Sequence, residues 1–396
     1  MSGLPGVNIT IKNGLGRVNP TDDACAGMIV SGTVTTGYTT LGTVVQLFSL
    51  QAFIDLGFTE ANNALAYNDV KNFYDEAGEG AELWLMVVSD ATLLATLCDN
   101  ATTGTSVKTL LNAANGRIRI LSINRKPPVA YTSVYTTGLG GVDDDCYGAI
   151  AKLQVVADNF AAAFKPFRAI LVGQGFRSTT IGTLDLKTLV ANRVAVLIGG
   201  INTGIVSCGL LLGRFASIPV QRNPGRVKDG MIMLTGATFP DGTAVNSIEA
   251  SWNSIHDKGY IFFRNYYGKA GFFVTDDPTC AANSNDYCSF ARGRVIDKAL
   301  VIAYATMVEE LNDDIEVEQT TGYISAAVIG SWQSNVENAL MQNMTGEVSG
   351  SPVCFIEPKQ NFLSSDTIAV GISIVPKGYA KKINITLGMT NPFKTA

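Results

Sequence analysis

The chain has 396 residues and a formal net charge of −5, and its 29 Lys and Arg residues are scattered rather than clustered. Proteins that bind nucleic acids usually show a basic patch or stripe, so the sequence argues against that class. Charged residues make up 16% of the chain, against a usual share of about 25%. This composition fits either an ordinary Gly-rich protein or one that covers much of its surface with copies of itself.

Neither a disulfide framework nor a membrane span is expected. The seven cysteines are widely spaced and include no C-x-x-C pair, so we expect free thiols and no zinc ribbon. The start, MSGLPGVNIT, lacks the basic and apolar segments of a secretory signal. Glycines and polar residues interrupt the uncharged stretch 194–213. They favour a strand, a turn and a buried helix from about Gly204 over insertion into a membrane.

The first element, within GVNITIKNG at 6–14, has a close counterpart near the other end of the chain, KINITLGM at 382–389. Both alternate apolar and polar residues, which predicts extended β-strand arms with one face meant for burial. Their apolar positions are Val7, Ile9, Ile11, Ile383, Ile385 and Leu387. Chain ends are loose unless they are tied down. These strands therefore need a partner, either as edge strands of their own subunit or in another chain.

Strands and helices alternate between about 21 and 235. Buried strands are expected at 25–32, 43–49, 81–89, 116–124, 167–175 and 193–200, and helices at 49–58, 59–77, 142–164 and from about 204. Strand–helix–strand units are usually parallel and right-handed, so this order predicts an α/β sheet domain. Gly209 and Gly213 in the last helix permit close approach of another backbone.

The regular alternation of strands and helices ends at about 236, and we expect a second, α+β domain from there to about 380. An aromatic stretch at 258–277 is expected to form a hairpin-like pair of strands. Two amphipathic helices follow, at about 289–313 and at about 323–344, and the second contains Trp332. TIAVGISIVP at 367–376 is expected to be a strand.

Catalytic chemistry has little support in the sequence. The one histidine, His256, has no nucleophile motif nearby, and we interpret it as a surface or loop residue. GQGFRS at 173–178 lacks the third glycine of a dinucleotide loop and the lysine of a P-loop. Acidic pairs are interpreted as structural, because neighbours in a run usually point in different directions; these pairs are Asp22–Asp23, Asp143–Asp145, Asp276–Asp277 and Asp313–Asp314. We predict no catalytic residue, no cofactor and no metal site.

Several segments, taken together in chain order, resemble one known family. They are TVVQLFSLQAFIDLGF, AYNDVKNFYDEAGEGAELWLMVVS, GLLLGRFASIPVQRNPGRVKDG, NSIHDKGYIFFRNYYGKAGFFVTDD, GRVIDKALVIAYATMVEELN, GSWQSNVENALMQNM and, most specifically, TIAVGISIVPKGYAKKINITLGM. This order resembles contractile tail sheath proteins of phage tails or related contractile injection systems. The stretch 91–142 matches least and is a candidate decoration. The Trp-Gly-x-Arg-Thr typical of the family is replaced around Phe272–Asp276.

The resemblance implies a structural protein rather than an enzyme. Sheath subunits stack in sixfold rings around an inner tube, and they contract to drive it through a target envelope. Its implied partners are copies of itself, the inner tail tube protein, and baseplate and tail terminator proteins. It implies linking arms at 1–20 and 381–396, an α/β outer domain at 21–235 and a tube-proximal domain at 236–380. The arms would add strands to neighbouring subunits, a role carried over to Val7–Ile11 and Ile383–Leu387.

The resemblance further implies assembly in the host or producer cytoplasm, and a mature location in a virion tail or injection-system sheath. Two alternatives stay open. The first is an α/β enzyme that acts on a small molecule at the carboxyl edge of the sheet. The second is an inner-tube or capsid protein, which the α/β half disfavours. PKGYAKK and KNGLG are candidate hinges for the arms.

Overall fold

A seven-stranded sheet forms the centre of the protein in its computed structural model, which describes residues 22–136, 141–180, 184–201, 205–312, 314–360 and 368–389. The strand order is β2-β3-β1-β4-β5-β7-β8. These strands are β1 (Ala26–Ser31), β2 (Val44–Leu47), β3 (Leu83–Val88), β4 (Ile120–Asn124), β5 (Arg168–Val172), β7 (Val194–Leu197) and β8 (Tyr260–Ile261). All neighbours pair in parallel except β2 and β3, which are antiparallel. The predicted mostly parallel α/β sheet is confirmed.

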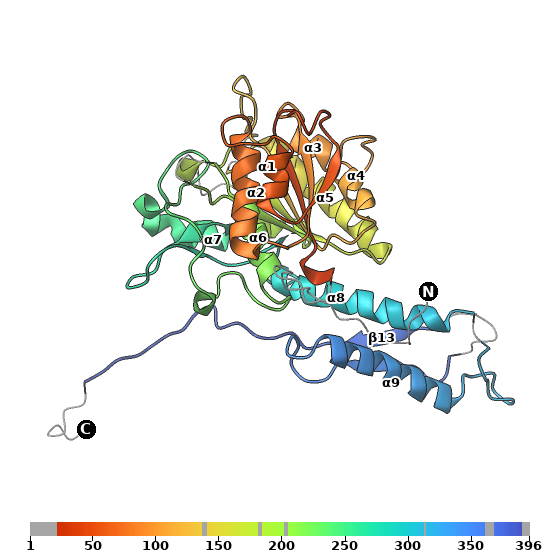
Figure 1. Ribbon diagram of the computed structural model, residues 1–396. Coiled ribbons are helices and arrows are strands. Elements are labelled where there is room, and N and C mark those ends of the chain that lie inside the picture. The colour runs from red at the N-terminus through yellow and green to blue at the C-terminus, as the bar shows by residue number, and fades with distance from the viewer. Residues whose placement is uncertain are drawn as a thin grey trace, which may run out of the picture.

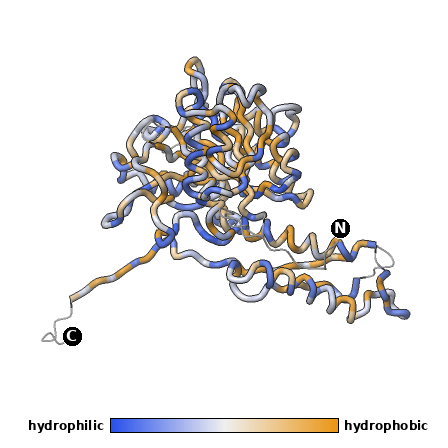
Figure 2. The backbone as a smooth tube through the Cα atoms, viewed as in Figure 1, coloured by the Kyte–Doolittle hydropathy of each residue, from blue (hydrophilic) through white to orange (hydrophobic). Residues whose placement is uncertain are grey.

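Helices cover both faces of this sheet (Figure 1). One group comprises α1 (Leu50–Asp55), α2 (Ala64–Ala77) and α6 (Cys208–Ser217), and the other comprises α3 (Leu94–Leu97), α4 (Val107–Ala113) and α5 (Asp144–Ala162). A sheet covered on both faces needs strands that are apolar throughout, which explains runs such as LWLMVV in β3. Figure 2 accordingly shows hydrophobic residues concentrated in the region of the sheet.

Helices α2 and α6 pack backbone against backbone. A Cβ atom on Gly209 would lie 2.0 Å from the carbonyl oxygen of Asp69, and one on Gly213 would lie 2.5 Å from that of Phe73. Any side chain at these positions would therefore force the helices apart. The predicted close approach at both glycines is confirmed.

A second hydrophobic cluster forms an extension beside the sheet. It contains α8 (Phe290–Met307), α9 (Ala326–Asn343), and the antiparallel pair of β12 (Val353–Ile356) and β13 (Val370–Ser373). Figure 1 shows α8 and α9 running side by side away from the sheet. Trp332, Val336 and Leu340 are buried in this cluster, which explains the apolar periodicity of α9.

The remaining elements are short. They are α7 (Trp252–Asp257), β6 (Val190–Ala191), β9 (Phe263–Arg264), β10 (Phe273–Val274), β11 (Cys280–Ala281), and 3-10 helices η1 (Asp22–Ala24), η2 (Ser178–Thr180), η3 (Leu186–Thr188), η4 (Val227–Asp229), η5 (Val245–Ser251) and η6 (Val308–Glu310). Among the helices that the structure describes, none has the length and apolar character that a membrane crossing requires.

Two expectations about segment placement change. The strand pair expected at 258–277 is present as β9 and β10, but the start of the same stretch forms β8, which joins the main sheet beside β7. The main sheet therefore includes a strand, β8, from beyond residue 236, the expected start of the second domain. Within the candidate decoration 91–142, β4 pairs with both β1 and β5, so this part belongs to the middle of the sheet. The domain boundaries themselves stay predictions.

Candidate assembly interface

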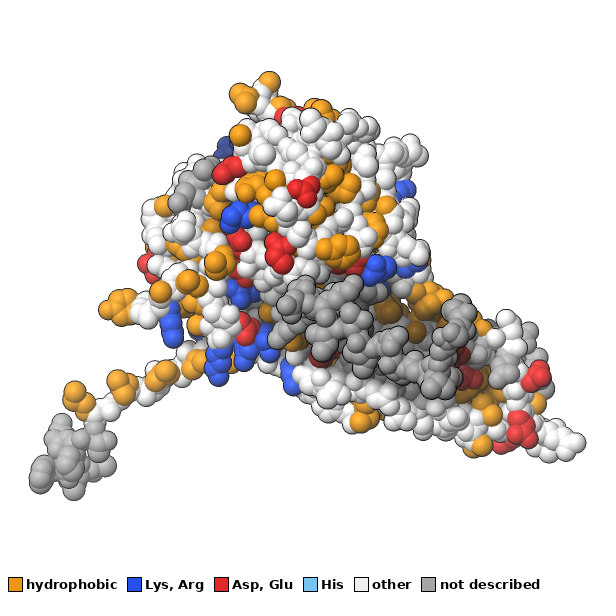
Figure 3. Space-filling model, viewed as in Figure 1, with side chains coloured by type: hydrophobic (Ala, Val, Ile, Leu, Met, Phe, Trp, Pro, Cys, Tyr) orange, Lys and Arg blue, Asp and Glu red, His pale blue; other side chains and the backbone are white. Residues whose placement is uncertain are grey.

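After Pro376, which forms a β-bridge with Val348, the C-terminal segment 377–389 leaves the body as a single extended stretch without a neighbouring strand among the described residues (Figure 1). Its apolar side chains are unusually exposed: Ile383 is 73% exposed, Ile385 84% and Leu387 94%. Figure 3 shows apolar side chains spaced along this segment, away from the rest of the molecule. Contiguous exposed apolar surface is uncommon on an isolated protein, so this segment is a candidate contact site. The corresponding N-terminal residues, Val7, Ile9 and Ile11, lie outside the described residues.

We call this segment the C-terminal arm and its first residues, up to Lys381, the root of the arm. Two side chains attach the root to the body. The hydroxyl of Tyr379 donates to the carbonyl oxygen of Gln221 at 2.5 Å. The ammonium of Lys381 lies 2.7 Å from Oδ2 of Asp276. Both residues lie in PKGYAKK, so this expected hinge is anchored at two of its side chains in the structure.

The anchor for Lys381 is the acidic pair Asp276–Asp277, which follows β10. Both carboxylates are buried, and Nδ2 of Asn223 donates to Oδ1 of each, at 2.8 Å to Asp276 and 2.6 Å to Asp277. Oδ2 of Asp277 accepts hydrogen bonds from the hydroxyl of Ser289 at 2.7 Å and from the backbone N–H of Ala291 at 2.8 Å. Asp277 thus fixes the N-terminus of α8, while Asp276 faces the arm.

His256, on α7, also reaches this pair. Its Nε2 lies 3.2 Å from Oδ2 of Asp276, and its Nδ1 lies 3.3 Å from Oδ1 of Asp257. The side chain is 37% exposed, so the expected surface position holds only in part. Sequence reasoning missed this cluster because its members come from five separate stretches of chain.

The groups in this cluster shift one another's pKa values. Burial raises the pKa of Asp277 above its usual value, and the neighbouring charge of Asp276 adds to this effect. Burial also opposes ionisation of Asp276, but the hydrogen bond from His256 and the Lys381 ammonium outweigh it and hold its pKa below the usual value. The same hydrogen bond raises the pKa of His256. The cluster therefore favours a charged Asp276 with cationic neighbours.

The small sheet of β12 and β13 has two outer edges, and that of β12 is partly occupied, because Glu337 and Gln333 of α9 bind the backbone N–H and C=O of Cys354. Each of these strands pairs only with the other among the described residues. Cys354 and Ile356 face the second cluster and are buried, whereas Val353 is 55% exposed and Phe355 57%. A strand edge beside exposed apolar side chains is a ready template for another strand.

The carboxyl edge of the main sheet is occupied by the protein's own side chains. Asp143 accepts a hydrogen bond from the backbone N–H of Asp145 and so caps α5. The carboxylate of Asp145 accepts from the N–H groups of Leu94 and Ala95, and it pairs with the buried Arg125 at 3.1 Å. The structural interpretation of this acidic pair is therefore confirmed, and its carboxylates are already bound.

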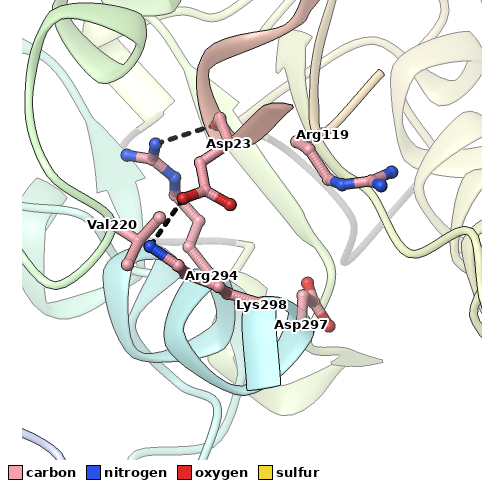
Figure 4. A pocket seen from close by; sticks show the side chains of 6 residues that line it. All are labelled: Asp23, Arg119, Val220, Arg294, Asp297 and Lys298. Atoms are coloured by element: carbon pink, nitrogen blue, oxygen red, sulfur yellow. Dashed lines mark hydrogen bonds and ion pairs between the residues drawn. The ribbon is translucent and has the colours of Figure 1, made fainter. Parts of the chain in front are cut away.

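A small pocket lies at the junction of the sheet and α8 (Figure 4). Its lining residues are Asp23, Arg119, Val220, Arg294, Asp297 and Lys298, and its volume is about 10 Å³. Asp23 lies between Arg294 and Lys298 and binds both. The pocket has room for about one water molecule, not for an organic substrate. Among the described residues, no group of three or more His, Cys, Asp or Glu side chains forms a metal site.

Two protein-family models together match most of the chain. The DUF2586 N-terminal domain matches residues 4–278, and the DUF2586 C-terminal domain matches residues 286–394. The chain belongs to the DUF2586 family. The gap between the two matched domains of this DUF2586 protein, residues 279–285, contains β11 and precedes α8, where the chain passes from the sheet to the extension. No curated protein matches the chain.

Solved structures show which fold this DUF2586 protein has. It is similar to the helical sheath of the anti-feeding prophage (AFP) in the contracted state, with 13% identity, a TM-score of 0.62, and coverage of 98% of this chain and 100% of the other. It is also similar to a chain of the sixfold-symmetrised AFP baseplate, with 13% identity, a TM-score of 0.63 and the same coverage. The contracted PVC sheath complex of an extracellular contractile injection system gives 12% identity, a TM-score of 0.60, and coverage of 98% of both chains. The expected resemblance to contractile sheath proteins is confirmed at the level of the fold.

Proposed function

We propose that this chain is the structural subunit of a contractile sheath. Its subunits stack as hexameric rings around an inner tube, and their contraction drives the tube through a target envelope. The support is a fold shared with sheath chains over 98% of the length, together with the exposed C-terminal arm. The role requires no catalysis, since the energy would come from new contacts between subunits.

The observation that carries this proposal is the apolar face of the arm. Ile383, Ile385 and Leu387 alternate with polar residues and are almost fully exposed in the single subunit. A strand with one apolar face gains stability when it pairs with a sheet that buries that face. Within the described chain the arm has no such sheet, so a neighbouring subunit would supply it. The N-terminal positions Val7, Ile9 and Ile11 carry the same pattern and would act in the same way.

The outer edges of β12 and β13 are suited to receive an arm, that of β13 more than that of β12, whose Cys354 backbone groups bind side chains of α9. Their backbone groups would hydrogen-bond to the incoming strand, and the exposed Val353 and Phe355 would cover part of its apolar side. The edge of the sheet would supply affinity, and alternate side chains would set the register. Each subunit would thus hold its neighbour through a hydrogen-bonded ladder rather than through surface charge.

The remaining roles follow the same scheme. Residues 1–20 and 381–396 would be linking arms, 21–235 the outer α/β part and 236–380 the tube-proximal part. Partners would be the inner tube protein, baseplate proteins and a terminator at the end of the sheath. Assembly would take place in the cytoplasm of the host or producer cell, and the mature sheath would belong to a virion tail or an injection system.

Electron microscopy of the purified chain tests polymerisation. Hollow striated cylinders support the proposal, whereas dispersed monomers at high concentration favour a small-molecule enzyme. Two matched variants then test the arm. Ile385→Asp places a charge on the apolar face and should abolish polymers, while Asn384→Asp places the same charge on the other face and should leave them intact. Folding of both monomers is checked by circular dichroism, and equal polymerisation of the two variants would contradict strand exchange.

A further inference from the structure

The chain's single histidine and the root of the C-terminal arm contact the same carboxylate oxygen. Nε2 of His256 lies 3.2 Å from Oδ2 of Asp276, and Nζ of Lys381 lies 2.7 Å from that atom. The other oxygen of Asp276 is occupied by Nδ2 of Asn223 at 2.8 Å. Lysine keeps its charge across neutral pH, whereas histidine changes its charge there. One oxygen is therefore shared by a permanent cation and a switchable one.

Asp277 offers Lys381 no equivalent partner. Its nearest oxygen lies 3.8 Å from the lysine ammonium, and both of its oxygens already accept hydrogen bonds, from Asn223, Ser289 and the backbone of Ala291. Asp277 is also fully buried, which disfavours its ionised form. The electrostatic hold on Lys381 therefore depends mainly on Asp276.

We propose that protonated His256 and Lys381 compete for Oδ2 of Asp276, so that protonation of the histidine loosens the root of the C-terminal arm from the body. Linkage makes the effect reciprocal: release of Lys381 must increase the affinity of His256 for its proton by the same factor. Tyr379 keeps a second attachment to Gln221, so the arm gains freedom at Lys381 before it separates from the body.

Other charged groups near His256 and Lys381 also shift the pKa values of these two side chains. Asp257 on α7 and Lys187 on η3 act on His256, the first raising and the second lowering its pKa. Burial lowers the pKa of Lys381, but Asp276 and Asp277 together outweigh it and raise that pKa. Cys288 also acts on Lys381 and raises its pKa. Arg292 and Arg294 on α8 lower the pKa of the nearby Tyr379. Among these groups, His256 and Lys381 share one oxygen.

Because the chain has one histidine, the proton can be followed directly. Full-length protein carrying ¹³C-labelled histidine gives a single ring signal, whose chemical shift against pH yields the pKa of His256. Lys381→Met removes the competing charge and keeps the aliphatic stem. The pKa of His256 should then rise by about half a unit or more, which is about a threefold gain in proton affinity. Lys382→Met, at the adjacent exposed residue, should leave it unchanged. An unchanged or lowered pKa in Lys381→Met would overturn the proposal.

The movement of the arm is tested separately. A nitroxide label at Ile385→Cys, in a Cys288→Ser background, reports the mobility of the arm in dilute, unassembled protein. The mobile fraction should increase as the pH falls from 8 to 6, and this dependence should disappear in His256→Gln. Mobility that does not change with pH, or that changes equally in His256→Gln, would refute the switch. Both experiments use monomers, so their outcome is independent of whether the chain forms a sheath.

Discussion

Arg168 of β5 donates a hydrogen bond from Nε to Oδ2 of Asp297 on α8, over 2.8 Å and between residues 129 positions apart. The other oxygen of Asp297 accepts from Nη1 of Arg193 at 2.8 Å. The side chains of Arg168 and Asp297 are only 1% and 7% exposed. One buried carboxylate thus pairs with two arginines, one in β5 and one directly before β7, and ties the extension to the sheet.

Removal of this carboxylate should be costly. Asp297→Ala leaves the buried Arg168 without its counter-charge and Arg193 with only the exposed Asp158, and loss of one partner of a buried ion pair costs about 3 to 5 kcal/mol. We expect a loss of that size in the free energy of unfolding, measured with chemical denaturant. The control is Lys71→Ala, which breaks the exposed pair with Asp75 and should cost no more than about 1 kcal/mol. Equal losses in the two variants would contradict the role of Asp297.

Gly293 lies against the same arginine. A Cβ atom there would be 1.7 Å from Cζ of Arg168, so Gly293→Ala must displace the guanidinium from Asp297. We expect a lower thermal midpoint. Gly330→Ala, in α9, is the matched control, because nothing lies within 4 Å of its added methyl group. Alanine is favoured over glycine in a helix by about 0.8 to 1 kcal/mol, so the control should raise the midpoint. The same sign of change in both variants would contradict the steric explanation.

Gly209 should be equally intolerant of a side chain. In Gly209→Ala the methyl group would meet the backbone of α2 at 2.0 Å, and overpacking of this kind typically costs about 1 to 3 kcal/mol. Gly148→Ala in α5 places its methyl group 3.8 Å from Cβ of Ala95, an ordinary contact. Chemical denaturation of the two variants should show destabilisation only at Gly209. A neutral Gly209→Ala would mean that α2 and α6 separate without cost.

Asp69 should make stability depend on pH. Burial raises its pKa to about 7, despite hydrogen bonds from Asn124 and the backbone N–H of Gly209. An unfolded aspartate titrates near about 3.9, so between these values the folded state holds more protons. The contribution of Asp69 to stability is therefore largest at low pH and falls as the pH rises to about 7.

A variant isolates this effect from the other titrating groups. Asp69→Asn cannot titrate, so its deficit in unfolding free energy relative to the parent chain should be smaller at pH 8 than at pH 5. The expected difference is between about 1 and 3 kcal/mol. A deficit that is constant with pH would show that Asp69 is ionised at both values.

Local sequence patterns determined much of the architecture. Continuous apolar runs such as 83–88 identify strands that are covered on both faces. The aspartates at 143–145 mark the start of α5, where the carboxylate of Asp143 accepts a hydrogen bond from the free N–H of Asp145. Alternation at 383–387 predicts a strand with one apolar face. Each signal depends on residues that are neighbours in the chain, so it can be recognised before folding is known.

Only the tertiary structure decided which distant residues meet. The aromatic stretch at 258–277 looks like one hairpin, and β9 and β10 form that pair, yet β8 at its start pairs with the distant β7 at the edge of the main sheet. Nothing local to Asp276, His256 or Lys381 shows that they share one oxygen, and nothing local to Arg168 points to Asp297. Burial in a common core brings these charges together, and their low-polarity surroundings make the contacts strong. The sequence by itself determined the strands, the caps and the apolar face of the arm, whereas the charged contacts that hold the arm and the extension depend on the folded packing.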